Sequence, residues 1–268
     1  MIETSTAQSY YIPPDIYGDT SGPHALRRND GQLFNTAGQA QNDIRYSVEQ
    51  WPVGIHLKDS SAISFTLASS NDTLVPDTLY RVDMHFRNAK RVDPIAIGVP
   101  VQGVMNYYLG STSVEGVPAF DRVLYPQAWD DIDVHIYSAS MGPRMAFVVH
   151  PGGNPAQIKL FFEGQDSLNI DWQNALRLYI RHRWVRFEEA VAYQVTPAGA
   201  TIPLGWMASY VILNGTPVVS FSFQAHDPSL PLVFQIGPPP MPLQSGGDPK
   251  NLHWSTFVGG GTNEERNY

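Results

Sequence analysis

The sequence contains no cysteine in its 268 residues, and it has few charged side chains. Without cysteine the chain has no disulfide bonds, no thiolate catalysis and no cysteine-ligated metal. Charged residues make up 16% of the chain, whereas soluble domains average about 25%. The formal net charge is -8, and a nucleic-acid-binding domain usually carries a basic patch. We therefore expect no nucleic-acid partner.

Long apolar runs are also missing. No stretch approaches the roughly 18 consecutive apolar residues of a membrane-spanning helix, so the sequence predicts no membrane span. The first residues, "MIETSTAQSYYIPPDIYGD", show no basic segment followed by an apolar stretch, as a secretory signal peptide would have. Taken by themselves, these residues leave a cytoplasmic or particle-associated location open.

Glycine and proline are plentiful, with 22 of each, and aromatic residues make up 12% of the chain. Frequent turn residues argue against long helices, and aromatic residues favour strands. Between the turns, every second residue is apolar over short stretches, which is the pattern of strands with one buried face. Examples are 44–48, 53–57, 63–67, 80–86 and 176–180. The sequence therefore predicts an all-β fold, an antiparallel β-sandwich.

The chain divides into four predicted segments. Residues 1–30 are polar and turn-rich and are expected to form an extended N-terminal arm. Residues 31–102 and 103–237 are expected to form two similar, tightly joined β halves, because "DIRYSV" in the first parallels "DIDVHIY" in the second. Residues 238–268 are predicted to be a Pro/Gly linker followed by an orphan strand.

The predicted orphan strand has a regular pattern. Trp254, Thr256 and Val258 share one of its faces. A strand without sheet partners exposes unpaired backbone groups, and such a strand pairs readily with the sheet edge of another chain. We therefore predict that these three residues belong to a partner-binding strand.

The segment "HPGGNP" separates two alternating stretches. It contains Pro151, Gly152, Gly153, Asn154 and Pro155: proline fixes φ, glycine accepts positive φ, and asparagine bonds to its own backbone. We predict a strand–turn–strand hairpin in which both glycines take unusual backbone angles. A phosphate-binding loop would lead into a helix, but the following "AQIKLFFEG" alternates as a strand. The turn is therefore expected to be structural.

No pattern in the sequence points to catalysis, to a cofactor or to a metal. The densest acidic segment, "WDDIDVH", places Asp131, Asp133 and His135 on one strand face, which we expect to face solvent. Three side chains spaced about 7 Å apart along a strand cannot alone complete a zinc or calcium shell. The histidines are scattered, and no His-Glu-x-x-His motif is present. We therefore expect no catalytic residue, no metal and no cofactor.

Aromatic residues are the best candidates for a binding surface. Their flat, amphipathic rings stack on sugars and contact proteins, although core packing is the more common reason for such residues beside strands. The candidates are Tyr107, Tyr108, Trp129, Trp172, Trp184 and Trp206.

Six segments occur in an order that resembles a known family. They are "NYYLGS" (106–111), "RVLYPQAWDDIDVHIYS" (122–138), "MAFVVHPGGNPAQIKLFFEGQDSLNID" (145–171), "AVAYQ" (190–194), "HDPSLPLVFQIGP" (226–238) and "WSTFVGGG" (254–261). Together they resemble the uncharacterised all-β N-terminal domain that precedes SBBP-type β-propeller repeats in large cell-surface and secreted proteins of Bacteroidota. The resemblance implies type IX secretion and a chain that continues into propeller repeats. It implies no catalytic residue.

We therefore expect a non-catalytic structural or interaction module of a bacterial cell-surface or secreted protein. Its expected partner is another protein or its own propeller repeats. Three alternatives stay open: a carbohydrate-binding or adhesion domain, a cargo or component of a phage-tail-like contractile injection particle, and a hydrolase. Exposed coplanar Trp and Tyr side chains would favour carbohydrate, and a cleft with converging carboxylates or histidines would favour a hydrolase.

Overall fold

The computed structural model describes residues 24–35, 37–50, 53–69, 78–98, 100–110, 112–139, 143–180, 183–187 and 190–237. Within these segments the chain forms 21 β-strands and one short 3₁₀ helix, η1 (Pro155–Gln157). No helix in these segments is long and apolar enough to cross a membrane. The expected all-β fold is confirmed.

The larger of the two main sheets has nine strands, in the order β19-β20-β13-β5-β4-β3-β2-β1-β9. They are β1 (Leu26–Arg28), β2 (Ile44–Gln50), β3 (Val53–Lys58), β4 (Ala62–Ser69), β5 (Thr78–Phe86), β9 (Ala119–Phe120), β13 (Lys159–Glu163), β19 (Trp206–Leu213) and β20 (Thr216–Phe223).

The second main sheet has seven strands, in the order β18-β17-β21-β12-β11-β10-β6. They are β6 (Ile95–Ala96), β10 (Arg122–Trp129), β11 (Ile132–Tyr137), β12 (Arg144–Val149), β17 (Val191–Val195), β18 (Thr201–Leu204) and β21 (Leu232–Ile236).

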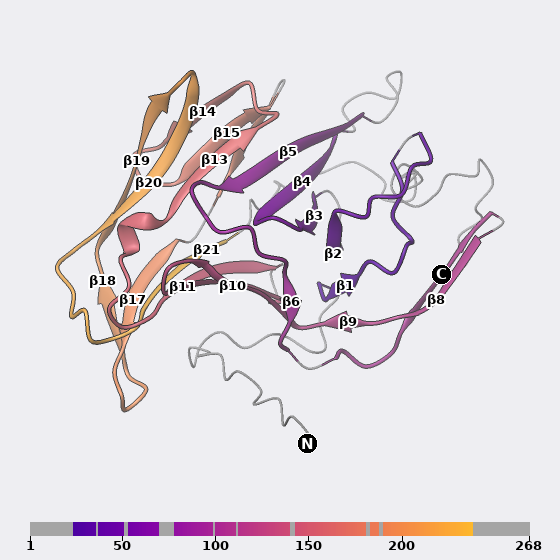
Figure 1. Cartoon of the computed structure of the whole chain (residues 1–268). Coiled ribbons are helices and arrows are strands. Elements are labelled where there is room, and N and C mark those ends of the chain that lie inside the picture. The colour runs from indigo at the N-terminus through magenta and orange to yellow at the C-terminus, as the bar shows by residue number, and fades with distance from the viewer. Residues whose placement is uncertain are drawn as a thin grey trace.

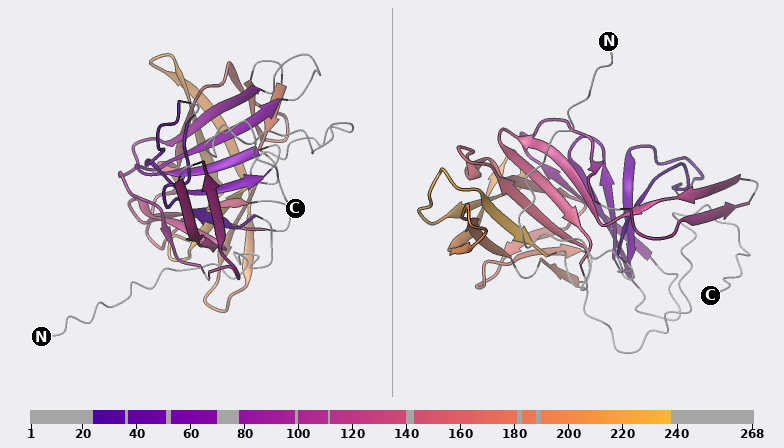
Figure 2. Two further views of the ribbon diagram at one scale, coloured as in Figure 1. Left: turned by 90° about the vertical axis from the view of Figure 1, so that its right-hand side faces the viewer. Right: turned by 90° about the horizontal axis from the view of Figure 1, so that it is seen from below.

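Two small sheets complete the described fold. One contains β14 (Ser167–Ile170), β15 (Leu176–Ile180) and β16 (Arg183–Arg186), and the other contains β7 (Met105–Leu109) and β8 (Thr112–Val117). The hairpin of β7 and β8 projects away from the sandwich (Figures 1 and 2).

The two main sheets face each other as a sandwich with antiparallel pairing throughout (Figures 1 and 2). The chain changes sheets repeatedly, because β12 belongs to the seven-stranded sheet while β13 pairs with β5 in the nine-stranded sheet. Strands from 31–102 and from 103–237 therefore share the nine-stranded sheet, and residue 103 does not mark a boundary between sheets.

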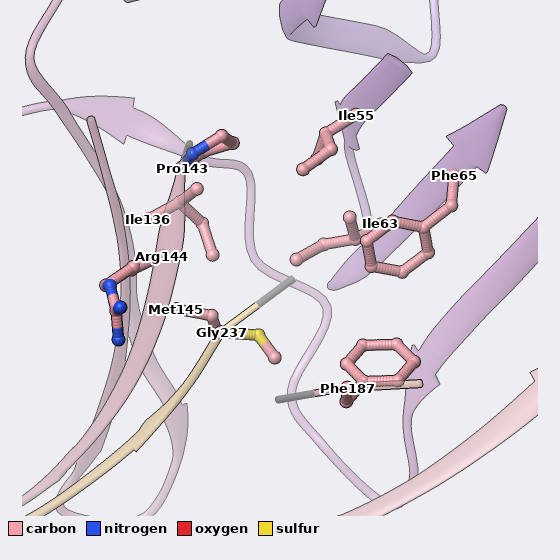
Figure 3. A pocket seen from close by; sticks show the side chains of 9 residues that line it. All are labelled: Ile55, Ile63, Phe65, Ile136, Pro143, Arg144, Met145, Phe187 and Gly237. Carbon is pink, nitrogen blue, oxygen red and sulfur yellow. The ribbon is translucent and has the colours of Figure 1, made fainter. Parts of the chain in front are cut away.

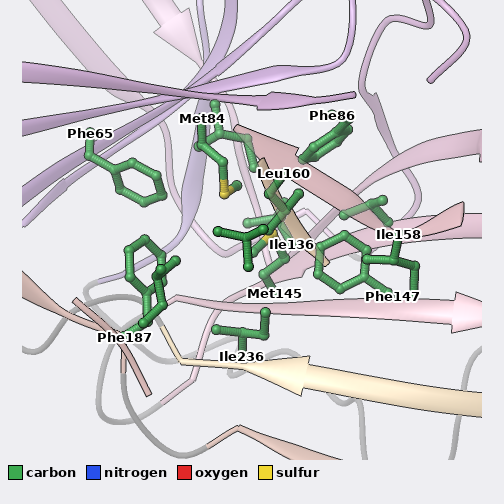
Figure 4. Close-up of a cluster of buried hydrophobic side chains, with 14 of the residues drawn as sticks. Phe65, Met84, Phe86, Ile136, Met145, Phe147, Ile158, Leu160, Phe187 and Ile236 are labelled. Atoms are coloured by element: carbon green, nitrogen blue, oxygen red, sulfur yellow. The ribbon is translucent and has the colours of Figure 1, made fainter. Parts of the chain in front are cut away.

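The core lies between the two sheets and follows the period-two pattern. On β5, Val82, Met84 and Phe86 are buried in the core. From the opposite sheet, Phe147 of β12 lies with its ring centroid 6.3 Å from that of Phe86. Figure 4 shows Met84, Phe86 and Phe147 among the side chains that fill the space between the two sheets. The β14–β16 sheet adds Leu178 to the same core.

The segment between β12 and β13 is a crossover between sheets, so the predicted hairpin is wrong. β12 pairs with β11 and β21, and β13 pairs with β5 and β20. Pro155 opens η1, and the side chain of Asn154 accepts a hydrogen bond from the backbone N–H of Ala156 at 3.0 Å. Gly152 has the expected positive φ, at 86°. Gly153 does not.

Gly153 is needed for space rather than for an unusual backbone angle. A Cβ atom at this position would lie 2.9 Å from Val149 Cγ1 and 3.0 Å from the carbonyl oxygens of Asp131 and His150. Two of these three neighbours are backbone atoms, so they cannot move aside easily.

Replacing Gly153 with valine is expected to lower the free energy of unfolding by about 1–3 kcal/mol, through overpacking against the backbone. Gly152→Ala is the matched control, because a Cβ there meets nothing within 4 Å and should cost only the roughly 1 kcal/mol of a positive φ. Urea unfolding of both variants measures the difference. Equal stability of Gly153→Val and the unmodified chain would show that the turn accommodates a side chain.

Candidate functional site

The structure separates the six aromatic residues predicted to form a ligand surface. Trp129 is 3% exposed, so the prediction is wrong for this residue, whereas Trp206 is partly buried and packs against the core. Trp172, in the turn between β14 and β15, is 89% exposed, and Tyr108 of β7 is 65% exposed. These two elements lie on opposite sides of the molecule (Figure 1). The exposed candidates therefore do not share one flat face.

Tyr107 is only partly exposed beside Tyr108. The remaining predicted positions lie outside the described residues. They are the side chain of Trp184 and all of Trp254, Thr256 and Val258.

Trp129 is buried because β10 places it between the sheets. Its ring centroid lies 5.4 Å from that of Phe86 and 6.1 Å from that of Phe147. Its Nε1–H donates to the carbonyl oxygen of Arg87 at 3.0 Å, which satisfies the indole donor. Trp206 likewise lies 5.1 Å from Phe234, centroid to centroid.

Of the three residues expected to face solvent, Asp131 is exposed in the turn before β11, whereas Asp133 and His135 of β11 are buried, contrary to the expectation. Asp133 is buried; its Oδ1 accepts from the backbone N–H of Gln127 at 2.6 Å, and its Oδ2 lies 2.8 Å from Nε2 of His150. Burial pushes the pKa of Asp133 upward, but the hydrogen bonds from His150 and Gln127 outweigh it and hold that pKa below its usual value. The hydrogen bond to Asp133 also raises the pKa of His150.

His135 occupies the same strand face, between Leu124 and Ala146 of the neighbouring strands. It is fully buried, and neither ring nitrogen has a hydrogen-bond partner among the described residues. Burial lowers the pKa of His135 to about 4, so the ring is neutral at pH 7. Alternation did not predict this burial, because all six residues of β11 are buried and both faces of the strand are therefore covered.

A polar cluster that the sequence did not reveal lies on the outward face of β3, β4 and β5. Cross-strand pairing places His56 beside Ser64, and Ser64 beside Asp83. Ser64 Oγ donates to Asp83 Oδ1 at 2.5 Å, and Arg81 binds both oxygens of the same carboxylate. His56 Nε2 lies 3.2 Å from Thr66 Oγ1. The period-two pattern predicts which residues of one strand share a face. Only the register between β3, β4 and β5 shows that His56, Ser64 and Asp83 are neighbours across the strands.

This cluster has the residue types of a hydrolase but not the hydrogen bonds of one. A serine nucleophile needs a histidine base that accepts its proton. Here Ser64 donates to Asp83, and His56 pairs with Thr66. Burial, followed by the charge of Arg81, lowers the pKa of His56 to about 4. These hydrogen bonds connect neighbouring strands, and they leave Ser64 without a histidine base that could activate it.

Metal ligands do not converge in the described segments, where no group of three His, Asp or Glu side chains is placed to hold an ion. Two small cavities lie within the described residues. One of about 20 Å³ is lined by apolar side chains such as Ile63, Phe65 and Met145, while Arg144 points away from them (Figure 3). A second, also about 20 Å³, lies beside Trp206 and Phe234. Small apolar spaces of this kind stay dry.

Exposed apolar side chains gather instead along β19, the terminal strand of the nine-stranded sheet. Five of its eight residues are large, apolar and between 41% and 63% exposed: Met207, Tyr210, Val211, Ile212 and Leu213. From sequence alone this charge-free strand, "WMASYVIL", looks like an interior strand. Its place at the edge follows only from the strand order.

The edge continues into the second sheet through a bend at Gly205. β18 is the terminal strand of the seven-stranded sheet, and residues 201–213 contain no charged side chain. The backbone oxygen of Gly205 accepts from the N–H of Gln224 at 2.9 Å, and its N–H donates to Gln224 Oε1 at 3.1 Å. A Cβ at Gly205 would lie 2.5 Å from Gln224 Cδ. One stretch of chain, residues 201–213, therefore borders both sheets.

The other described sheet edges carry features that discourage pairing. β6 and β9 have two residues each, and β14 has four. β16 carries Arg183 and Arg186, and the β7–β8 pair has an irregular register between Met105 and Tyr107. β19 is longer and pairs with β20 over eight residues without a break. It is the least protected edge in the described part of the molecule.

Comparison with known proteins gives one match. The sequence pattern of a family described as a domain of unknown function, DUF7948, matches residues 28–235. No curated protein and no solved structure matches the chain. The matched range begins within β1 and ends within β21, so it spans both sheets of the sandwich. The chain belongs to the DUF7948 family of domains of unknown function.

Proposed function

We propose that this domain is a non-catalytic interaction module of a bacterial cell-surface or secreted protein, and that it binds a partner by strand addition at β19. The observation that carries the proposal is the long, charge-free, exposed edge formed by β19. Monomeric sheet proteins usually blunt such edges, so an unprotected one is typical of a binding site.

Strand addition uses two kinds of contact. Backbone N–H and C=O groups of the edge strand pair with those of the incoming strand, and alternate side chains meet its side chains on both faces. β19 offers both, because Met207 and Val211 are exposed on one face and Tyr210 and Ile212 on the other. A protein segment in extended form is therefore the partner that fits this edge.

The proposed location rests on the resemblance to the domain that precedes SBBP-type propeller repeats. In that setting the incoming strand belongs either to a separate protein or to the propeller repeats of the same polypeptide. Carbohydrate binding has less support, since Trp172 and Tyr108 lie on elements far apart. A hydrolase also has less support, since Ser64, Asp83 and His56 are engaged in strand-to-strand hydrogen bonds.

Site-specific photo-crosslinking tests the proposal in the organism that carries the gene. A benzophenone amino acid at position 211 is expected to form a discrete protein adduct on illumination, because Val211 is exposed on the edge. The same probe at position 172 is the matched control, because Trp172 is more exposed but lies away from β19. Mass spectrometry identifies the adduct. No adduct at 211, or equal adducts at both positions, would contradict the proposal.

A further inference from the structure

We infer that two copies of this chain join through β19, paired antiparallel about a two-fold axis at Ser209, so that their nine-stranded sheets become continuous. The inference rests on the proposed binding at this edge and names the partner as a second copy. Three properties of the edge support it: the direction of its backbone groups, the fit between its side chains and the same side chains of a second copy, and its lack of charge.

The backbone groups of alternate residues point away from the fold. β19 and β20 form a hairpin closed by Asn214 and Gly215, which have φ of 52° and 79°. In such a two-residue hairpin, Leu213 and Thr216 form a hydrogen-bonded pair. Odd-numbered residues of β19 then face β20, in agreement with the hydrogen bond between the oxygen of Gly205 and the N–H of Gln224.

It follows that the N–H and C=O groups of four even-numbered residues point to the free edge. They are Trp206, Ala208, Tyr210 and Ile212. A second strand with the same pattern satisfies all of them only if even residues oppose even residues. A two-fold axis at Ser209 does this, because it sets residue 206 against 212 and residue 208 against 210.

The side chains match in that register. Met207 lies opposite Val211 of the second copy on the outward face, and Ser209 lies opposite Ser209. On the inward face the small Ala208 lies opposite the large Tyr210. Alternation of large and small side chains across a strand pair allows close packing.

Charge favours a second copy over a partner of different chemistry. The chain has a net charge of -8, so two copies repel each other overall. Residues 201–213 carry no charge, and the edge strand therefore approaches its own copy without repulsion. The same strand presents no charged group that would select an acidic or basic peptide.

Because the chain lacks cysteine, a single introduced cysteine reports the register directly. Ser209→Cys is expected to form a disulfide-linked dimer under mild oxidation, since a two-fold axis at this residue brings the two sulfur atoms together. Met207→Cys and Val211→Cys should each remain unlinked alone and form a mixed dimer together. Trp172→Cys is the control for random collision. Equal crosslinking of Ser209→Cys and Trp172→Cys would overturn the inference.

Sedimentation of the full chain tests the same contact without cysteine. Ile212→Pro removes an N–H that points outward and leaves the bonds to β20 in place, so the dimer dissociation constant is expected to rise about tenfold or more. Val211→Lys, which places a charged side chain opposite the apolar Met207 of the second copy, should weaken the dimer similarly. A chain that stays monomeric at high concentration overturns the inference. If position 211 still crosslinks to a different protein, the proposed function survives and only the identity of the partner is wrong.

Discussion

Replacing Trp129 with alanine is expected to destabilise the fold by about 3–5 kcal/mol, the usual loss for a large aromatic side chain in a core. The indole packs against Phe86 and Phe147 and donates to the backbone of Arg87. Its removal leaves a cavity between the sheets and an unpaired carbonyl oxygen. Urea unfolding followed by circular dichroism measures the change, since this variant also loses a fluorescent probe.

The matched control is Trp172→Ala, which removes the same side chain from an 89% exposed position. Surface substitutions of this kind usually change stability by less than about 0.5 kcal/mol. The two variants therefore separate a structural tryptophan from a surface tryptophan within one chain. If both lost the same stability, the placement of Trp129 between the sheets would be contradicted.

Lowering the pH from 7 to 5 is expected to reduce the free energy of unfolding by about 3–4 kcal/mol, through His56 and His135. Each has a pKa of about 4 in the folded chain because it is buried. In the unfolded chain each titrates near 6.5, so the unfolded state takes up protons first as the pH falls. Between pH 7 and pH 5, each histidine therefore lowers the free energy of unfolding by about 2 kcal/mol.

His150 changes the free energy of unfolding in the opposite direction as the pH falls. Its hydrogen bond to Asp133 raises its folded pKa, so its contribution is fully present below the unfolded pKa and is lost as the pH rises through the folded value. Groups facing His135 are Asp133, Arg122 and His150, and their charges act in both directions. The net result remains a loss of stability in acid, because two buried histidines oppose one paired histidine.

Two substitutions distinguish these contributions in urea unfolding at pH 7 and pH 5. His135→Leu is expected to halve the loss, because it removes one of the two buried bases. His150→Gln is expected to make the loss larger, because it removes the group that gains stability in acid. A stability that is flat between these pH values in the unmodified chain would show that His56 and His135 accept protons without unfolding.

The alternating pattern in the sequence identified individual strands correctly, but it did not show which strands pair with one another. Alternation at 176–180 correctly indicated a strand, and Leu176, Leu178 and Ile180 are buried as β15. The segment after Val149 was misread because turn residues show where a strand ends and not which sheet the next strand joins. Residues 149 and 159 flank the turn but belong to opposite sheets.

The candidate site was missed for a related reason. We expected the polar residues of β11 to face water, but both faces of this strand are covered, and Asp133 and His135 are buried. β19 reads as an interior strand because it lacks charge, although it lies at an edge. Whether a strand is central or terminal depends on pairings between distant segments, which local patterns do not encode.

The repeated change of sheets has a consequence for how the chain folds. Phe86 pairs with Leu160 in the nine-stranded sheet, and Phe147 pairs with Phe234 in the seven-stranded sheet, so neither sheet forms from one continuous stretch of sequence. Contacts this distant are slow to find, and all-β proteins dominated by them fold in milliseconds to seconds. During synthesis, β5 is complete long before β13 leaves the ribosome. Its open side is then a second place where strands of different chains can pair wrongly, so we expect the yield of folded protein to depend on how quickly β13 follows.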